Sequence, residues 1–300
     1  METLQKQKST SWKSDLDFLW IELTNKCNLN CVHCYADSSP FNELETKLDY
    51  KYWKNILKDA YRLNCRNIQF IGGEPTIYPH LNKLIEDAKK IGYDFIEVYT
   101  NGTVLSDEHL KTFTEHNVNL AFSIYSDNKE IHNKITKGKS SFDKMVKNIK
   151  RAKNSGLNIR ASIIEMKENL GTIKETENFV RRELGIDRIG IDRAREIGRA
   201  KDEKKDEYQE LCGACWDGKL AINSDGDVFP CVFSRFKTIG NISEGLNNIL
   251  NKQSLTDFRT KVKNLASKNN DILDICKPFN KCKPNCRPNC NPADDYCSPF

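Results

Sequence analysis

Three cysteines near the start of the chain are the first residues whose spacing could do chemistry. Cys27, Cys31 and Cys34 form a Cys-x3-Cys-x2-Cys motif directly after a β-rich run. Three thiolates can bind three irons of a [4Fe–4S] cluster and leave the fourth iron open, and an open position is what makes a metal site catalytic. A zinc site completed by His33, or three simple buried thiols, are the alternatives.

A second group of cysteines lies in the last third of the chain, where eight thiolates would suffice for two fully ligated [4Fe–4S] clusters. From residue 276 the sequence repeats the pattern Cys-x-Pro, and proline forbids a regular helix or central strand there. Bound metal is the natural candidate to hold such a segment, and zinc is the alternative to iron. The eight are Cys212, Cys215, Cys231, Cys276, Cys282, Cys286, Cys290 and Cys297.

The remaining composition excludes several classes of protein. Acids are interspersed with bases along the chain, and 47 Lys+Arg against 42 Asp+Glu leave a net charge of only +5, so nucleic acid is not an expected partner. No uncharged apolar run approaches the roughly 18 residues of a membrane span, and the polar first 15 residues lack a signal peptide. We therefore expect a cytoplasmic protein, where clustered cysteines bind metal more often than they form disulfides. Cys65 stands alone and is expected to be a small buried hydrophobe.

Elements that could position these motifs alternate along the first 200 residues. β-Rich runs and amphipathic helical patterns predict successive βα units around a parallel sheet, which presents its functional loops at the carboxyl ends of the strands. The expected strands are 18–23, 67–71, 95–99, 119–124, 158–164 and 188–192. The expected helices are 49–63, 80–91, 106–116, 140–155 and 170–184, with Ser106 as an N-cap.

The chain after residue 200 has a different character. The Lys- and Glu-rich segment 200–210 is the best linker candidate, and 224–227 is a strong hairpin signal between two short strands. One or two short helices are expected within 243–268. This divides the chain into an N-terminal tail (1–17), an α/β unit (18–200) and a cysteine-rich unit (201–300).

A glycine motif follows the second expected strand. Gly72 and Gly73 permit close backbone approach of a ligand, and the carboxylate of Glu74 beside them suits an ammonium group. Ordinary turn chemistry is the alternative for such a motif alone.

Taken together, these motifs resemble those of the radical S-adenosylmethionine (SAM) enzymes. The resemblance implies that Cys27, Cys31 and Cys34 hold the open [4Fe–4S] cluster and that the methionine moiety of SAM chelates its fourth iron. One-electron reduction then yields a 5′-deoxyadenosyl radical that abstracts a hydrogen from the substrate. His33 occupies the usual aromatic slot, and Tyr125 replaces an aspartate for which Asp127 could substitute. The residues that the resemblance assigns to SAM are Gly72, Gly73, Glu74, Pro75, Asn101, Ser123, Asp127, Ser162 and Arg193.

The C-terminal cysteines resemble a SPASM domain, which carries auxiliary iron–sulfur clusters. The resemblance implies one [4Fe–4S] cluster on Cys212, Cys215, Cys231 and Cys286. It implies a second on Cys276, Cys282, Cys290 and Cys297. Leu273 stands where the family usually has a cysteine, so Cys290 or Cys297 would replace that ligand.

The resemblance implies a partial (β/α)6 TIM-like barrel followed by a small irregular SPASM domain. Enzymes with this pairing mostly modify ribosomally made peptides, so a radical SAM oxidoreductase that crosslinks, epimerises or oxidises a peptide is expected. A reductant such as flavodoxin or ferredoxin would supply electrons, and a separate protein could bind the leader, since residues 1–17 are too short for a leader-binding domain. A dehydrogenase or epimerase of a small molecule, and a non-catalytic electron carrier, are the alternatives. The sequence identifies no hydrogen donor or general base.

Overall fold

A single open sheet organises the molecule. The computed structural model describes residues 16–44, 48–213, 215 and 218–268. The sheet has the strand order β6-β5-β4-β3-β2-β1-β7-β8-β9, with β6 and β9 at its edges, so it does not close into a barrel. Its parallel strands confirm the six expected ones: β1 (Phe18–Glu22), β2 (Asn67–Ile71), β3 (Phe95–Thr100), β4 (Asn119–Ile124), β5 (Ile159–Glu165) and β6 (Ile189–Arg193).

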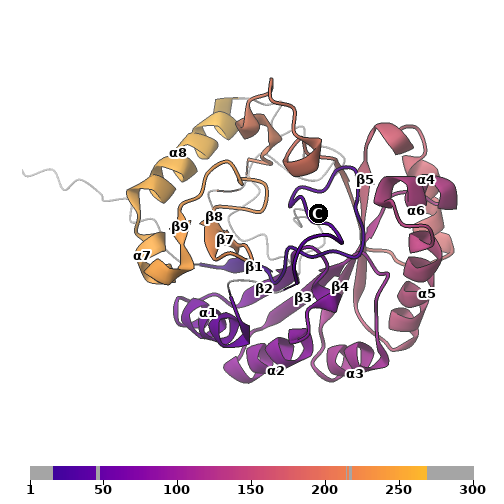
Figure 1. Cartoon of the computed structure of the whole chain (residues 1–300), viewed down its shortest axis with the longest axis horizontal. Coiled ribbons are helices and arrows are strands. Elements are labelled where there is room, and N and C mark those ends of the chain that lie inside the picture. Colours follow the sequence, from indigo (N-terminus) through magenta and orange to yellow (C-terminus); the bar gives the residue numbers. More distant parts are fainter. Residues whose placement is uncertain (1–15, 45–47, 214, 216–217, 269–300) are drawn as a thin grey trace, which may run out of the picture.

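Helices cover the outer face of the curved sheet (Figure 1). Helix α1 shows why: it buries Trp53, Ile56, Leu57 and Ala60, the spacing of one helical face. All five expected helices are present, together with one that the pattern does not predict, α4. The helices are α1 (Tyr50–Arg62), α2 (Leu81–Ile91), α3 (Asp107–Glu115), α4 (Lys129–Thr136), α5 (Ser141–Asn154) and α6 (Ile173–Arg182).

Local capping fixes the ends of several helices. Ser106 starts α3, as expected, because its side chain accepts a hydrogen bond from the backbone N–H of His109. Asn128 starts α4 in the same way by accepting from the N–H groups of Glu130 and Ile131. Gly92 ends α2 at a φ of 113°, which favours glycine.

The C-terminal part of the chain continues the same sheet. Strand β7 (Lys219–Ile222) pairs in parallel with β1, and the predicted hairpin is formed by β7 and β8 (Asp227–Phe229). Strand β9 (Gly240–Asn241) and helices α7 (Leu246–Leu250) and α8 (Gln253–Lys268) follow. The expected linker is not wholly open chain, because its end forms a 3-10 helix, η4 (Glu207–Glu210), in which Glu210 is buried.

The two faces of the sheet bury different cores. On β1, Leu19 and Ile21 face the outer helices, whereas Phe18 and Trp20 face inward and pack in a core that includes Phe229. This alternation is the two-residue period of a strand buried on both faces. No helix in the described ranges is long and apolar enough to cross a membrane.

Candidate active site

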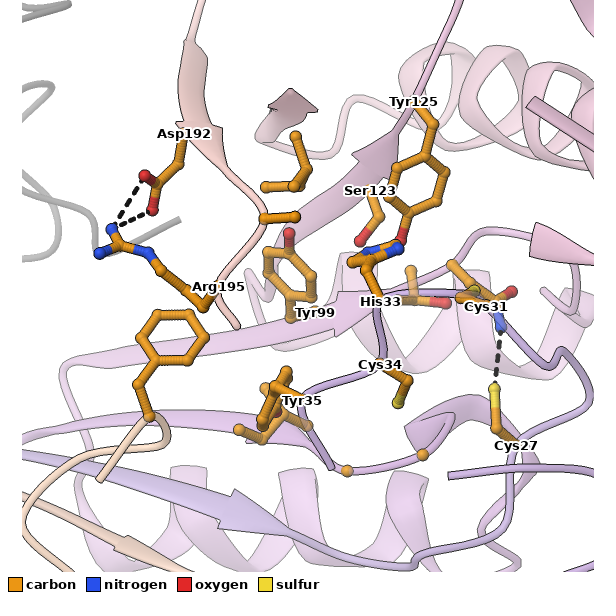
Figure 2. Close-up of a pocket in the computed structure, with 18 of the residues that line it drawn as sticks. Cys27, Cys31, His33, Cys34, Tyr35, Tyr99, Ser123, Tyr125, Asp192 and Arg195 are labelled. Carbon is orange, nitrogen blue, oxygen red and sulfur yellow. Dashed lines mark hydrogen bonds and ion pairs between the residues drawn. The ribbon is translucent and has the colours of Figure 1, made fainter. Parts of the chain in front are cut away.

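A cavity lies at the carboxyl ends of the parallel strands. It encloses about 920 Å³ of space, counted with its open mouth. Figure 2 shows Cys27, Cys31 and Cys34 on one side of it, with Asp192 and Arg195 on the other. The predicted site residues that line it are Cys27, Cys31, Cys34, Gly72, Gly73, Asn101, Ser123 and Arg193.

The cysteine loop after β1 supplies hydrogen-bond donors to its own sulfurs. The backbone N–H of Leu29 lies 3.4 Å from Cys27 Sγ, and that of Ser38 lies 3.3 Å from Cys34 Sγ. Asn101 Nδ2, from the end of β3, also donates to Cys27 Sγ at 3.7 Å (Figure 2). Donors aimed at sulfur stabilise thiolates and tune a cluster bound to them.

Arg199 holds the cysteine loop from the far side. Its guanidinium donates to the carbonyl oxygens of Cys31 and Ser38, and its backbone N–H donates to the carbonyl oxygen of Cys34 at 3.0 Å. Its other partner is the carboxylate of Asp37, at 3.0 Å. The sequence places Arg199 near the end of the α/β unit without a role, and the structure shows that it fixes the loop that carries the three cysteines.

Burial disfavours the thiolate form of two of the three cysteines. Burial raises the pKa of Cys27 to about 12 and raises that of Cys31 further, so both are neutral thiols unless positive charge is bound. Iron that binds the cysteine sulfurs as thiolates would displace these protons. No three His, Cys, Asp or Glu side chains in the described ranges are arranged to hold a single ion. A cubane takes each thiolate on a different iron, which matches three thiols spread along one cavity wall.

Gly72 and Gly73 pack against the cysteine loop. A Cβ on Gly73 would lie 2.0 Å from the carbonyl oxygen of Lys26, and one on Gly72 would lie 2.5 Å from that of Thr24. The Gly73 N–H donates to the Thr24 carbonyl at 2.6 Å. Glycine is therefore required here for contact between the two loops, and the same backbone forms part of the cavity wall.

Glu74 lies behind the cavity rather than in its lining. Its fully buried carboxylate accepts from the hydroxyls of Thr76 and Thr100 at 2.6 Å each, and from the N–H groups of Thr76 and Asn101 at 3.1 and 2.8 Å. Burial raises its pKa, and these donors oppose that effect. By accepting from its backbone N–H, Glu74 thus positions Asn101. Pro75 begins the 3-10 helix η1 (Pro75–Ile77) beside it, also outside the lining.

The remaining predicted SAM residues divide into two groups. Ser123 lines the cavity and hydrogen-bonds with the hydroxyls of Tyr99 and Tyr125. Ser162 is fully buried and accepts from Arg160 at 3.0 Å, and Asp127 accepts from the Thr176 hydroxyl at 3.1 Å. Neither of these two lines the cavity, and their assignment to SAM stays a prediction.

The edge of the cavity at β6 is charged but internally paired. Arg193 forms an ion pair with Glu210 at 2.9 Å, and Arg195 binds both carboxylate oxygens of Asp192 at 2.8 and 2.6 Å (Figure 2). The sequence analysis gave no role to Tyr99, Asp192 or Phe233, which also line the cavity. The available signal was position, since the first two lie at strand ends and Phe233 lies two residues after Cys231.

Three of the C-terminal cysteines come together beside this cavity. Cys215 and Cys231 are buried, and the thiols of Cys212 and Cys231 lie close enough to Cys215 to raise its pKa. Their neighbour Phe233 lines the cavity. Cys65 lies elsewhere, fully buried in the outer core with its thiol on the Asn67 carbonyl, as expected of a small hydrophobe. Outside the described residues lie Cys276, Cys282, Cys286, Cys290 and Cys297.

The chain belongs to the radical SAM superfamily, whose family model matches residues 21–180. Residues 212–290 match the SPASM family, described as an iron–sulfur cluster-binding domain. The cofactors are therefore SAM with an iron–sulfur cluster in the first part, and auxiliary iron–sulfur clusters in the second. The thiols brought together at both places fit these groups.

Among characterised relatives, the chain is 28% identical over 258 residues to the antilisterial bacteriocin subtilosin biosynthesis protein AlbA of Bacillus subtilis, covering 74% of this chain and 56% of AlbA. It is 28% identical to the tungsten-containing aldehyde ferredoxin oxidoreductase cofactor-modifying protein of Pyrococcus furiosus, over 57% of this chain and 50% of that protein. The chain spans about half the length of the curated relatives it matches.

Solved structures share the fold. Streptococcus suis SuiB bound to its precursor peptide SuiA superposes with a TM-score of 0.67 at 18% identity, covering 82% of this chain and 67% of SuiB. The structure of anSMEcpe with bound AdoMet and the Cp18Cys peptide superposes with a TM-score of 0.64 at 16% identity, covering 84% of this chain and 86% of anSMEcpe.

Proposed function

We propose that this chain modifies a ribosomally made peptide by radical chemistry, installing a crosslink, an epimerised residue or an oxidation. The observation that supports this most is one cavity that Cys27, Cys31 and Cys34 line from one side and Phe233, of the SPASM segment, lines from another. AlbA, named for bacteriocin biosynthesis, is related to this chain in sequence, and SuiB, solved with a precursor peptide bound, has a similar fold.

The residues of the cavity have separate parts in this proposal. Bound at Cys27, Cys31 and Cys34, the cluster with SAM supplies a carbon-centred radical that removes a hydrogen atom from the substrate. Asn101 donates a hydrogen bond to the Cys27 sulfur. The Glu74 carboxylate accepts from the backbone N–H of Asn101, which fixes Asn101 at the end of β3. The apolar rings of Tyr99 and Tyr125 limit water at the site, which protects a reactive radical.

The partners belong to the same proposal. A flavodoxin or ferredoxin would reduce the cluster, and a separate protein could bind the peptide leader. The auxiliary thiolates would hold two [4Fe–4S] clusters, which would supply an acceptor for the electron left on the substrate when a crosslink forms. Cys212, Cys215 and Cys231 are proposed as ligands of the first.

Metal content and SAM cleavage test the first half of this proposal. Protein reconstituted anaerobically should hold about twelve irons and twelve sulfides, four in each of three cubanes. With SAM and dithionite it should release 5′-deoxyadenosine, and Cys31→Ala should abolish the release. Undiminished release from the variant would contradict the assignment of the catalytic cluster.

The substrate class needs its own experiment, because relatives that match the chain over half its length include a GTP 3′,8-cyclase of Synechocystis. Short peptides encoded beside the gene should be incubated with SAM, dithionite and the enzyme in D2O. Loss of two hydrogens indicates a crosslink or oxidation, and incorporation of one deuterium indicates epimerisation. Peptides that stay unchanged while 5′-deoxyadenosine release is stimulated by a small molecule would favour the small-molecule alternative.

A further inference from the structure

Arg195 lines the cavity and contacts the segments that carry the auxiliary cysteines. It follows β6, lines the cavity and is only 5% exposed. The function proposed above assigns it no role, and a buried arginine is costly to retain even beside a carboxylate such as Asp192. Its surroundings therefore indicate what the charge could act on.

One side of the guanidinium reaches the segment that leads into Cys212. Arg195 Nη1 donates to the carbonyl oxygen of Glu210 at 3.0 Å, two residues before that cysteine. The thiol of Cys212 is close enough to interact electrostatically with the guanidinium. The arginine is thus fixed beside the first auxiliary thiol.

A second contact reaches the segment after Cys231. The guanidinium carbon lies 5.3 Å from the centre of the Phe233 ring, and the backbone N–H of Phe233 donates to Cys231 Sγ at 3.3 Å. Arg195 therefore packs against the two stretches that supply Cys212 and Cys231, and the thiol of Cys215 lies near both of these thiols.

The guanidinium keeps its positive charge in this buried place. Asp192 binds Nη2 from the cavity side at 2.8 and 2.6 Å, while Nε has no hydrogen-bond partner among the described residues. A cation held in a poorly solvated region stabilises an added electron nearby, and net charge and hydrogen bonds set the potential of an iron–sulfur cluster.

We propose that Arg195 raises the reduction potential of the auxiliary cluster on Cys212, Cys215 and Cys231, and that Asp192 moderates this effect from the cavity side. Reduction adds one electron, donated by dithionite, to the cluster, and no bond forms or breaks. The proposal rests on the proposed ligand set but not on the peptide substrate. It makes Arg195 a tuning residue that acts through the cluster.

Redox titration of the reconstituted full-length protein, followed by low-temperature electron paramagnetic resonance without peptide, tests this. Signals that change on addition of SAM belong to the catalytic cluster and are set aside. At a fixed potential, Arg195→Gln should lower the ratio of reduced to oxidised auxiliary cluster on the order of tenfold, the effect of one charge across roughly 10 Å of protein. Asp192→Asn should raise the ratio, and the ratio in Arg195→Lys, which keeps the positive charge, should stay near that of the parent.

Opposite shifts in the two variants are the decisive result, because a misfolded site cannot produce both. The matched control is Arg181→Gln, which removes an α6 arginine paired with Glu177 and should leave the ratio unchanged. If Arg195→Gln binds less iron than the parent, the ratio measured in Asp192→Asn alone decides whether the proposal holds. An unchanged or lower ratio in Asp192→Asn, a shift of equal sign in both variants, or protein that binds no auxiliary iron overturns the proposal.

Discussion

At the residue scale, the Glu74 carboxylate connects the glycine motif to the end of β3. Its four donors come from Thr76, Thr100 and Asn101, and two of them are backbone N–H groups that can only donate. An ionised carboxylate, which only accepts, satisfies all four. The side chain therefore stabilises the wall of the cavity even though it does not line it.

Glu74→Gln should destabilise the folded protein because the amide NH2 would face at least one of these donors in the buried site. We expect a loss of about 2–3 kcal/mol in the free energy of unfolding, measured with urea on the metal-free protein under reducing conditions. The matched control is Glu86→Gln on α2, whose partly exposed carboxylate pairs with Lys90 and should cost less than about 0.5 kcal/mol. Equal stability of the two variants would contradict the structural role of Glu74.

Spacing alone singled out the three cysteines that line the cavity, but not every residue around it. The three cysteines of the first motif lie close in sequence, so one loop fixes their arrangement. Tyr99 and Asp192 lie inside strands β3 and β6, and whether they face the cavity depends on how the sheet curves over six strands. That curvature is a property of long-range packing, which one sequence does not display.

At the element scale, α4 links the cysteine loop to the outer layer. The backbone N–H groups of Asn30 and Val32 donate to the carbonyls of Thr136 and Ile135 at its C-terminal end. The helix has only eight residues and few apolar positions, so its periodicity does not predict it. Its contacts join residues a hundred positions apart, which explains why the sequence pattern missed it.

His132 buries an imidazole on α4. It is 1% exposed, packs against the rings of Tyr125 and Phe142, and its Nδ1 has no partner in the described part of the chain. Burial lowers its pKa to about 4 from the ordinary histidine value of 6.5. Because the unfolded chain binds this proton more tightly, stability is full above pH 6.5 and is lost as the pH falls toward 4.

His132→Phe should therefore make the acid side of the stability profile shallower. The lowered pKa corresponds to at most about 3 kcal/mol lost between pH 6.5 and 4. Urea unfolding of the metal-free protein across this range measures the slope. Part of this slope will remain in the variant, because burial also lowers the pKa of His33 to about 4. His116→Phe, at the half-buried C-terminal end of α3, is the control, and an identical slope in both variants would contradict the prediction.

At the scale of the whole molecule, the two expected units share one sheet and an ion pair whose carboxylate is buried. Strand β7 extends the sheet from β1, and Arg235, after the auxiliary Cys231, reaches back to Glu22 on β1 at 2.5 Å. The Glu22 carboxylate is 4% exposed, and burial raises its pKa. Arg235 also lies 5.3 Å from the ring of Tyr35 on the cysteine loop. The contacts of Arg235 join β1 and the cysteine loop to the segment after Cys231.

Removing one partner of this pair should cost more than removing both. Arg235→Met leaves the Glu22 carboxylate buried and uncompensated, which should cost about 3–5 kcal/mol of unfolding free energy. Glu22→Gln added to Arg235→Met removes the uncompensated charge and should recover most of that loss. Urea unfolding of the parent, both single variants and the double variant gives the coupling energy. The exposed pair of Arg62 and Asp59 on α1 is the control, with an expected coupling below about 0.5 kcal/mol. Additive effects of the Glu22 and Arg235 substitutions would show that this ion pair does not couple the two units.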